Sequence, residues 1–472
     1  MNRSVNRSIN HSINRRHFLA AAGGAYLSSL SAPAQDTGAA AFTVRIGSVD
    51  VEIAPRRMFK TIGYNGSVPG PPLRMTEGQP VTIDVVNETS TPELVHWHGL
   101  FIPAEVDGSA EEGTPPVPSK GRQRYQFTPR PSGTRWYHSH TYAGRNLHRG
   151  GYTGQFGFLQ IVPKQDPARY DQEVLLALHG WDPYFTTMGA GGDSGEGSLE
   201  VGYNRHTVNS HALGLGEPVR VREGQRVLFR ILNASATEAH RMALPGHQFT
   251  VVALDGNAVP TPRAVDVLEL APAERIDAIV EMNRPGVWIL GEADDKMRQS
   301  GLGVVIEYAN RQGLAQWTAP GAAAWDYTLF GRDSPAAEPD ERVPLVFKPK
   351  FAGNRWVDHW TINGKEFPKT DPIRVKTNGR YRLIFDNQSD DAHPVHLHRH
   401  SFELVSIAGK PTAGVMKDVV MCPARKKVEV QFVADNPGPT LFHCHQQLHM
   451  DFGFMAMVEY EGYKSTAPMR HG

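Results

Sequence analysis

The stretch TEGQPVTI at Thr76–Ile83 recurs twice along the chain, and this repetition decides the fold. The matching stretches are REGQRVLF at Arg222–Phe229 and KTNGRYRL at Lys376–Leu383. Each begins a block that runs from a turn through an alternating strand and an Asn-containing polar turn to a further segment. Self-similarity of this kind indicates copies of one supersecondary unit. The sequence therefore predicts three copies of one β unit.

The local patterns agree with an all-β fold. Short alternating runs of Val, Ile, Phe and Leu are separated by Gly, Pro and Asn, and no long stretch has a helical period. We predict that each unit is a Greek-key β-sandwich. The three domains are placed at residues 42–163, 164–310 and 344–462. The Ala, Pro and charge-rich stretch 311–343 is predicted to be an extended linker.

Histidines occur in pairs separated by one residue in the first and third units. The four pairs are His96/His98, His138/His140, His396/His398 and His443/His445. In an extended strand, side chains at i and i+2 lie on the same face. A single pair of this kind is more often an ordinary surface or core feature, whereas four pairs indicate metal binding. We expect these eight imidazoles to form a cluster of three metals where the two ends of the chain meet.

Cys444 lies between His443 and His445 and faces the opposite side of the strand. His393 and His449 remain available as its neighbours. A thiolate with imidazoles suits a soft or borderline transition metal, and two His with one Cys is typical of blue copper. The sequence thus predicts that one short peptide serves two kinds of metal site.

At these residues the chain resembles the multicopper oxidases, the family that includes laccases, bacterial cuprous oxidases, bilirubin oxidase and ascorbate oxidase. All four copper motifs of the family match, and the resemblance spans nearly the whole mature chain. It implies three tandem cupredoxin-like domains of the laccase-like bacterial type. It also implies four copper ions per chain, one of type 1, one of type 2 and two of type 3.

The resemblance assigns each ligand to a copper. It makes Cys444, His393 and His449 the ligands of the type 1 copper. It makes His96 and His396 the ligands of the type 2 copper. The other six would hold the type 3 pair, namely His98, His138, His140, His398, His443 and His445.

The same resemblance implies an activity. Type 1 copper would take single electrons from a reductant, and the three-copper cluster would reduce dioxygen to two waters with four electrons. The 13 methionines form no cluster like the methionine-rich insert of dedicated cuprous oxidases, so we expect a laccase-like enzyme acting on phenols and aromatic amines. Oxidation of Cu(I) or Mn(II) is the alternative. A copper nitrite reductase, which needs only a mononuclear second centre, and a non-enzymatic copper protein are the remaining hypotheses.

Two acids and one axial position complete the predicted site. Asp107 matches the acid that relatives place beside the type 2 copper, and Asp451 is a second candidate because Met450 occupies the position where many bacterial relatives have an acid. Both are predicted to relay protons. In the family the axial neighbour of the type 1 copper lies ten residues past the cysteine, so the resemblance places Phe454 there, while a shift of one residue would place Met455 there. Phe454 is favoured and predicts a high-potential site.

The middle unit lacks these ligands. Where the third unit has HCH at 443–445, the middle unit has LGE at 290–292. It is predicted to be a copper-free spacer, and His240 and His247 are interpreted as residual sandwich histidines. Cys422 is interpreted as a small buried apolar residue, because pairing with Cys444 would destroy the metal site.

The N-terminus predicts export. NRRHFL at Asn14–Leu19, a mildly apolar stretch and APA at Ala32–Ala34 are typical of a twin-arginine signal peptide that ends at residue 34. The mature protein is therefore expected to be periplasmic or secreted, not inserted in a membrane, and monomeric. Lys plus Arg and Asp plus Glu are equal at 49 each, which argues against nucleic-acid binding and favours small partners, a reductant and dioxygen. The glycine-rich stretch 189–197 receives no assigned role.

Overall fold

The computed structural model describes residues 38–163, 169–188, 198–321, 325–351 and 358–463. The predicted signal at 1–34 and the glycine-rich stretch at 189–197 lie outside these ranges. Within the described ranges the strands form six sheets, and the α-helices are two five-residue segments, α1 (Asp295–Gln299) and α2 (Gln447–Asp451). None of these helices has the length and apolar character needed to cross a bilayer. The predicted all-β class is confirmed.

The first pair of sheets contains eight strands, each four residues or longer. One sheet has the order β2-β1-β4-β6, with β1 (Phe42–Ala54), β2 (Arg57–Tyr64), β4 (Val81–Asn87) and β6 (Arg122–Phe127). The other has the order β3-β8-β7-β5, with β3 (Gly70–Thr76), β5 (Val95–His98), β7 (Gly133–Ser139) and β8 (Phe156–Val162). Alternate residues of β4 are buried, as expected for a strand with one face on the core.

The middle pair of sheets has six and five strands. The larger has the order β10-β9-β12-β17-β14-β15, with β9 (Gln172–Met188), β10 (Ser198–Val208), β12 (Arg226–Asn233), β14 (Phe249–Leu254), β15 (Asn257–Val265) and β17 (Arg275–Glu281). The smaller has the order β11-β19-β18-β13-β16, with β11 (Val219–Val221), β13 (His240–Ala243), β16 (Val267–Leu270), β18 (Val287–Glu292) and β19 (Gly303–Tyr308).

The last pair of sheets repeats the middle pair strand for strand. Its larger sheet has the order β21-β20-β23-β28-β25-β26, with β20 (Glu341–Phe351), β21 (Asp358–Ile362), β23 (Arg380–Asn387), β25 (Phe402–Ile407), β26 (Lys410–Lys417) and β28 (Lys427–Val433). Its smaller sheet has the order β22-β30-β29-β24-β27, with β22 (Ile373–Val375), β24 (His393–Leu397), β27 (Val419–Cys422), β29 (Thr440–Cys444) and β30 (Met455–Tyr460).

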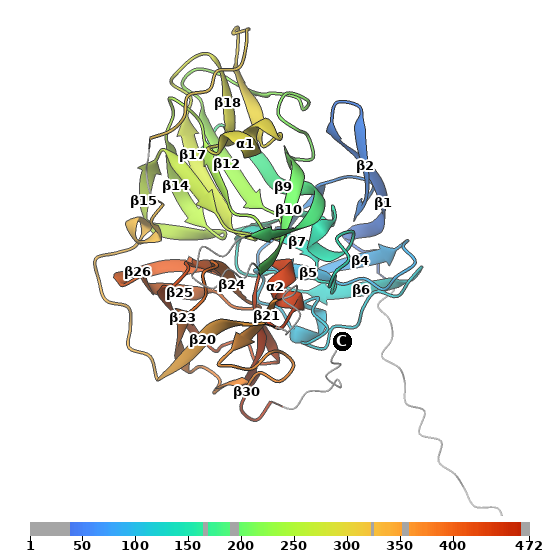
Figure 1. The fold of residues 1–472 in the computed structure, drawn as a ribbon, viewed down its shortest axis with the longest axis vertical. Coiled ribbons are helices and arrows are strands. Elements are labelled where there is room, and N and C mark those ends of the chain that lie inside the picture. Colours follow the sequence, from blue (N-terminus) through green and yellow to red (C-terminus); the bar gives the residue numbers. More distant parts are fainter. Residues whose placement is uncertain (1–37, 164–168, 189–197, 322–324, 352–357, 464–472) are drawn as a thin grey trace, which may run out of the picture. The chain divides into compact units, whose positions relative to one another are not determined.

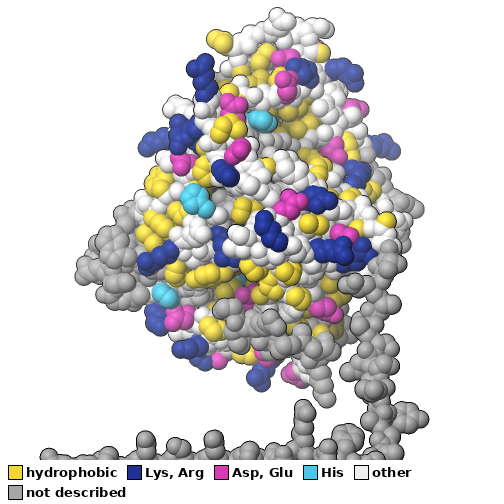
Figure 2. Space-filling view, turned by 90° about the vertical axis from the view of Figure 1, so that its right-hand side faces the viewer, with side chains coloured by type: hydrophobic (Ala, Val, Ile, Leu, Met, Phe, Trp, Pro, Cys, Tyr) yellow, Lys and Arg dark blue, Asp and Glu magenta, His cyan; other side chains and the backbone are white. Residues whose placement is uncertain are grey.

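The repeat found in the sequence explains this correspondence. Its three copies begin at the turns before β4, β12 and β23, and each of these strands pairs in parallel with the strand that opens its own unit. Figure 1 shows the middle unit in green and yellow, with the blue first unit and the red third unit beside it. On the face drawn in Figure 2, Lys and Arg side chains are interspersed with Asp and Glu.

The stretch predicted as an extended linker contains local structure. Tyr327–Phe330 forms a 3-10 helix that contacts β15 and β26, and the side chains of Tyr327 and Phe330 are buried. Strand β20 begins at Glu341, inside the same stretch. These two aromatic anchors stabilise the segment by burying apolar area, which its Ala, Pro and charge-rich composition did not indicate.

Candidate metal centre

Strand pairing places the histidine pairs opposite one another. In the first unit β5 pairs with β7 so that His96 faces His138. In the third unit β24 pairs with β29 so that His396 faces His443. Because alternate residues of a strand share a face, each pairing brings two motifs together on one surface. The short strands are buried throughout, so both surfaces point into the protein.

All eight paired histidines meet in three groups built from both ends of the chain. Within each group the potential ligand atoms lie within 4.8 Å of one another. The groups are His96, His98 and His396; His98, His138 and His445; and His140, His398 and His443. The ring centroids of His96 and His398 are 4.0 Å apart, and those of His98 and His396 are 3.9 Å apart. The expected convergence of the two ends of the chain is therefore present.

A fourth group joins His393, Cys444 and His449. The Nδ1 atoms of the two imidazoles are 3.1 Å apart, and each lies 3.7 Å from Cys444 Sγ. All three residues are buried. The cysteine thus belongs to one group while its two sequence neighbours belong to two others, as alternation along β29 requires.

Buried nitrogens without partners point into the three histidine groups. Within the described part of the chain, six of these atoms have no hydrogen-bond partner: Nε2 of His96, His138, His140, His396 and His445, and Nδ1 of His98. Native proteins rarely leave buried polar atoms unsatisfied, so each such atom requires an explanation. A metal ion bound by these nitrogens provides one.

The neighbouring rings of His398 and His443 also indicate a bound cation. His398 Nδ1 lies 2.8 Å from a carboxylate oxygen of Asp107, and His443 Nδ1 lies 2.9 Å from the carbonyl oxygen of Cys444. Both Nδ1 atoms therefore carry a hydrogen, since those oxygens only accept. The two Nε2 atoms are 3.0 Å apart and present lone pairs to each other in the neutral rings. A cation between them would relieve that repulsion.

Burial also keeps these rings in the form that metals bind. It lowers the pKa well below its usual value in seven of them: His98, His138, His393, His396, His398, His443 and His445. It lowers the pKa of His140 to about 4. Neutral imidazoles are the metal-binding form, so the donor set suits a borderline transition metal.

His449 is different because it touches an acid. Burial opposes its protonation, but hydrogen bonds to Cys444 and Glu200 outweigh that effect and raise its pKa to about 10. Its Nε2 lies 3.4 Å from Glu200 Oε1, which comes from β10 of the middle unit. A positive charge is therefore favoured between Cys444 and Glu200, and a metal ion that binds His449 would displace the proton of that ring.

Asp107 lies against the histidine groups from the first unit. One carboxylate oxygen is 2.8 Å from His398 Nδ1 and 3.1 Å from His96 Nδ1. Burial raises the pKa of Asp107, but His96 outweighs this effect and the net pKa is low. Burial and repulsion by Asp107 hold the pKa of neighbouring Glu112 well above its usual range. Asp107 is thus the ionised member of a buried carboxyl pair.

Asp451 lies on α2, and Gln447 connects it to a cavity beside the histidines. Its carboxylate accepts hydrogen bonds from Gln447 Nε2 at 2.9 Å and from the backbone N–H groups of Ala143 and Gly144. Burial raises the pKa of Asp451 to about 7. An acid with this pKa exchanges protons readily near neutral pH.

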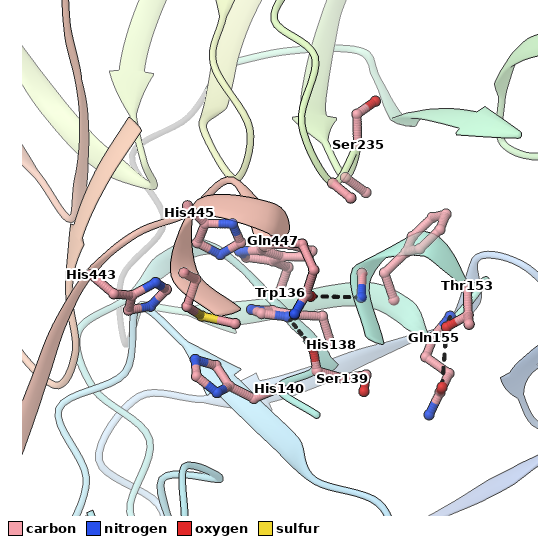
Figure 3. A pocket seen from close by; sticks show the side chains of 15 residues that line it. Trp136, His138, Ser139, His140, Thr153, Gln155, Ser235, His443, His445 and Gln447 are labelled. Carbon is pink, nitrogen blue, oxygen red and sulfur yellow. Dashed lines mark hydrogen bonds between the residues drawn. The ribbon is translucent and has the colours of Figure 1, made fainter. Parts of the chain in front are cut away.

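The cavity leaves about 30 Å³ open to the centre of a water-sized molecule. Its lining includes His138, His140, His443, His445 and Gln447. Figure 3 shows the four histidines on one side of the cavity and Thr153 and Gln155 on the other. The cavity therefore has room for a molecule the size of water beside the histidine groups.

Phe454 and Met455, the two candidates for the axial position of the type 1 copper, have different surroundings in the structure. The ring of Phe454 is buried and lies 4.9 Å from the ring of His393. Met455 belongs to a different cluster with Leu441 and Met450. Trp360 packs on both histidines that are predicted to bind the type 1 copper. Its ring centroid is 4.5 Å from that of His393 and 4.4 Å from that of His449. The surroundings of the thiolate are therefore aromatic and apolar.

The middle unit has no such group in its described part. His240 Nε2 lies 2.9 Å from Ser235 Oγ, and His247 Nε2 lies 2.6 Å from Tyr308 Oη. Both histidines therefore have protein partners. In the third unit, Cys422 is buried, and burial raises the pKa of its thiol.

The structure reveals four contacts that sequence reasoning missed. They are made by Glu112 with His398, by Glu200 and Trp360 with His449, and by Asp418 with His98. Three of these residues have no distinguishing pattern, because each acts on a histidine remote in sequence. Asp418 did leave a signal, since the charged pair Lys417-Asp418 interrupts the apolar run from Val415 to Val420. Charges inside an apolar strand pattern indicate buried ion pairs.

Comparisons with known proteins agree with this geometry. Three family models, each described as multicopper oxidase, match residues 46–166, 193–302 and 339–462. The multicopper oxidase MmcO of Mycobacterium tuberculosis is 30% identical over 440 residues, which cover 85% of this chain and 83% of that protein. Laccase-3 of Thanatephorus cucumeris is 25% identical over 505 residues, covering 84% and 86%.

Solved structures show the same fold. The multicopper oxidase of Pseudomonas thermotolerans superposes with a TM-score of 0.70 at 27% identity, covering 89% of this chain and 100% of that one. The multicopper oxidase Fet3p superposes with a TM-score of 0.76 at 20% identity, covering 89% and 90%.

Proposed function

The chain belongs to the multicopper oxidase family and is a copper-dependent oxidoreductase that uses dioxygen, and from this premise we propose a laccase-like enzyme with four coppers per chain. Its reductants are phenols and aromatic amines. The observation that carries the proposal is the position of Cys444 in one ligand group and of its two neighbours in two others. Copper supplies one-electron acceptance from the reductant and four-electron reduction of dioxygen to water.

The proposed ligand assignment is the one that the resemblance to the family implies. His393, Cys444 and His449 would hold the type 1 copper. His96 and His396 would hold the type 2 copper. The type 3 pair would be held by the remaining six histidines, which are His98, His138, His140, His398, His443 and His445.

The peptide around Cys444 supports electron transfer between the two parts of the site. Its Sγ belongs to the group with His393 and His449, and its backbone continues directly into His443 and His445. A continuous covalent path therefore joins the group that contains Cys444 to the two groups that contain His443 and His445. The aromatic packing of Trp360 and Phe454 keeps water away from the thiolate.

Asp107 and Asp451 are proposed to relay protons for water formation, Asp107 by accepting a proton and passing it on. Asp107 contacts the outer nitrogens of His96 and His398. Asp451 is linked through Gln447 to the cavity that reaches the histidines. Proton transfer by a positioned side chain typically contributes about 10²- to 10⁴-fold to a rate.

Oxidation of a metal ion is the second candidate function, and two acids favour it. Glu200 lies against the outer nitrogen of His449, and burial raises the pKa of nearby Asp391 while the His449 charge lowers it. Carboxylates at the edge of the electron-entry site attract cationic reductants. Among the relatives, copper resistance protein A of Pseudomonas syringae is 24% identical, and a multicopper oxidase of Campylobacter jejuni with a known structure is a metallo-oxidase.

Oxygen uptake with a model phenol, with and without added Cu(I), separates these functions. Purified protein should contain about four coppers per chain, show the blue colour of a thiolate-bound cupric ion, and consume oxygen with the phenol alone. Uptake only with Cu(I) would establish the metal-ion oxidase. Two coppers per chain with nitrite reduction would contradict both.

Export and oligomeric state are also proposed. Residues 1–34 would direct twin-arginine export, placing the mature enzyme in the periplasm or outside the cell as a monomer. Replacing Arg15 and Arg16 with Lys should retain the protein in the cytoplasm, which cell fractionation detects. Size-exclusion chromatography with light scattering tests the monomer.

A further inference from the structure

Asp418 is a fully buried carboxylate at the junction of β26 and β27. Arg275 donates to both of its oxygens, through Nη1 to Oδ1 at 2.7 Å and through Nη2 to Oδ2 at 2.6 Å. Arg135 Nη1 lies 3.3 Å from Oδ2. His98 Nε2 lies 3.1 Å from Oδ1. The carboxylate therefore has two guanidinium partners and one imidazole partner.

The contact with Asp418 determines which ring nitrogen of His98 carries the hydrogen and which carries the lone pair. An ionised carboxylate only accepts hydrogen bonds, so His98 Nε2 carries the hydrogen and donates it. The neutral ring then has its lone pair on Nδ1. This is the His98 nitrogen without a partner in the described part of the chain, and it faces the histidine groups.

The main chain of Asp418 orients a second ring. Its carbonyl oxygen accepts a hydrogen bond from His396 Nδ1 at 2.7 Å, which leaves the His396 lone pair on Nε2. The rings of His98 and His396 stack at 3.9 Å with an interplanar angle of 11°. One residue thus fixes two imidazoles that come from opposite ends of the chain.

Each of the three domains contributes to holding Asp418. Arg135 is on β7 of the first unit, and Arg275 is on β17 of the middle unit. Asp255 of the middle unit accepts hydrogen bonds from the backbone N–H groups of Asp418 and Val419 at 3.2 Å each. The middle unit therefore restrains both the side chain and the backbone of this residue.

We infer that Asp418, clamped by Arg275 and Arg135, is a positioning residue that sets the orientation of His98 and His396 for copper. This inference rests on the proposed copper cluster. It gives the copper-free middle domain a direct part in assembling that cluster, because Arg275 and Asp255 belong to it. Residues that hydrogen-bond the far side of a metal-binding imidazole typically contribute about 10- to 100-fold to metal affinity or activity.

The test compares copper retention in the full-length enzyme and two variants of the same chemistry. Asp418→Asn removes the charge that orients His98. Asp277→Asn is the matched control, because Asp277 is buried in the same interdomain region and bonds Arg230 and Thr134. Copper-loaded proteins are dialysed against increasing concentrations of a chelator, and copper per chain, blue absorbance and unfolding temperature are measured.

Asp418→Asn should lose the colourless fraction of its copper at a chelator concentration about 10- to 100-fold lower than the wild type, while the blue absorbance at Cys444 persists. Asp277→Asn should lower the unfolding temperature and retain copper like the wild type. Retention by Asp418→Asn equal to that of Asp277→Asn would overturn the inference. A wild type that binds copper without consuming oxygen would sink the proposed function alone, because retention is measured without turnover.

A crystal structure of the copper-loaded wild type keeps the inference falsifiable if Asp418→Asn does not fold. Copper on His98 Nδ1 with Nε2 still bonded to Asp418 is the expected result. Copper on Nε2, with Asp418 turned away from the ring, would overturn it.

Discussion

Glu200 and His449 meet across a domain boundary, with a carboxylate oxygen of Glu200 3.4 Å from His449 Nε2. Glu200 is on β10 of the middle domain, and His449 is on α2 of the third. The Glu200 side chain is largely but not fully buried. The middle domain thus places a negative charge at the outer edge of the group that contains the thiolate.

Glu200→Gln should discriminate between reductants. Without the charge, the KM for a cationic reductant such as Mn(II) should rise about ten-fold, because electrostatic attraction raises the local concentration of cations. The KM for a neutral phenol should stay within about two-fold. Steady-state oxygen uptake measures both, with the exposed Glu88→Gln as control. An equal rise for both reductants would show that Glu200 acts on His449 and not on the substrate.

Asp107→Asn should slow the oxygen half-reaction. The carboxylate contacts His96 and His398, and its replacement by an amide removes a proton acceptor at that position. The rate of reoxidation of the reduced enzyme by oxygen should fall by about 100-fold or more. Stopped-flow recovery of the blue absorbance reports that rate. Asp84→Asn, which breaks a partly exposed pair with Arg124, should reoxidise normally. A normal rate in Asp107→Asn would exclude the proton role.

Phe454→Met should lower the midpoint potential of the blue copper. A thioether introduced at this buried position beside His393 would provide an axial ligand, whereas the native ring cannot coordinate. A redox titration followed by blue absorbance measures the change. Met455→Leu is the control, because Met455 packs with Leu441 and Met450. A shift in Met455→Leu instead would identify Met455 as the axial residue.

His179 should make folding stability depend on pH. Burial lowers its pKa to about 4 from an ordinary 6.5, so the folded state binds fewer protons than the unfolded state between these values. Its contribution is present above pH 6.5 and is lost as the pH falls to about 4, on the order of 3 kcal/mol in all. Denaturant unfolding at pH 7.5 and 4.5 should show a smaller loss in His179→Asn than in the wild type. Equal losses would show that His179 is not the group responsible.

Removing copper should lower the unfolding temperature. The histidine groups combine ligands from the first and third domains, so bound metal stabilises their interface by mass action. Calorimetry before and after chelation should show the decrease, and added Cu(II) should reverse it. A magnesium salt serves as the control, because a soft donor set does not bind Mg²⁺ well. An unchanged transition would contradict an interdomain metal cluster.

Much of the fold was predictable because the repeated unit can be recognised in the amino-acid sequence alone. The stretches at 76–83, 222–229 and 376–383 precede equivalent strands, and the middle and last units share one strand order. The segment 311–343 was harder to predict. Its 3-10 helix depends on Tyr327 and Phe330 finding buried positions against β15 and β26, which composition cannot reveal.

The convergence of the site was predictable only where strand periodicity carried the information. Histidines two residues apart on a strand share a face, and this rule predicted that the two imidazoles of each pair lie together, while the meeting of the two ends of the chain was an added assumption. Glu200 and Asp418 could not be assigned a role in this way. Each contacts one imidazole more than 240 residues away in sequence, and such a contact exists only after the domains have packed.

The sequence His443-Cys444-His445 contributes one ligand to each of three of the four groups within three consecutive residues. Rigid-body motion of one domain against another can change which reductant binds near Glu200, but it cannot change the covalent bonds within this tripeptide. The length of the proposed electron path through the tripeptide therefore does not depend on motion between the domains. Substitutions at the surface where the reductant binds can accumulate during evolution while the length of this covalent path remains constant.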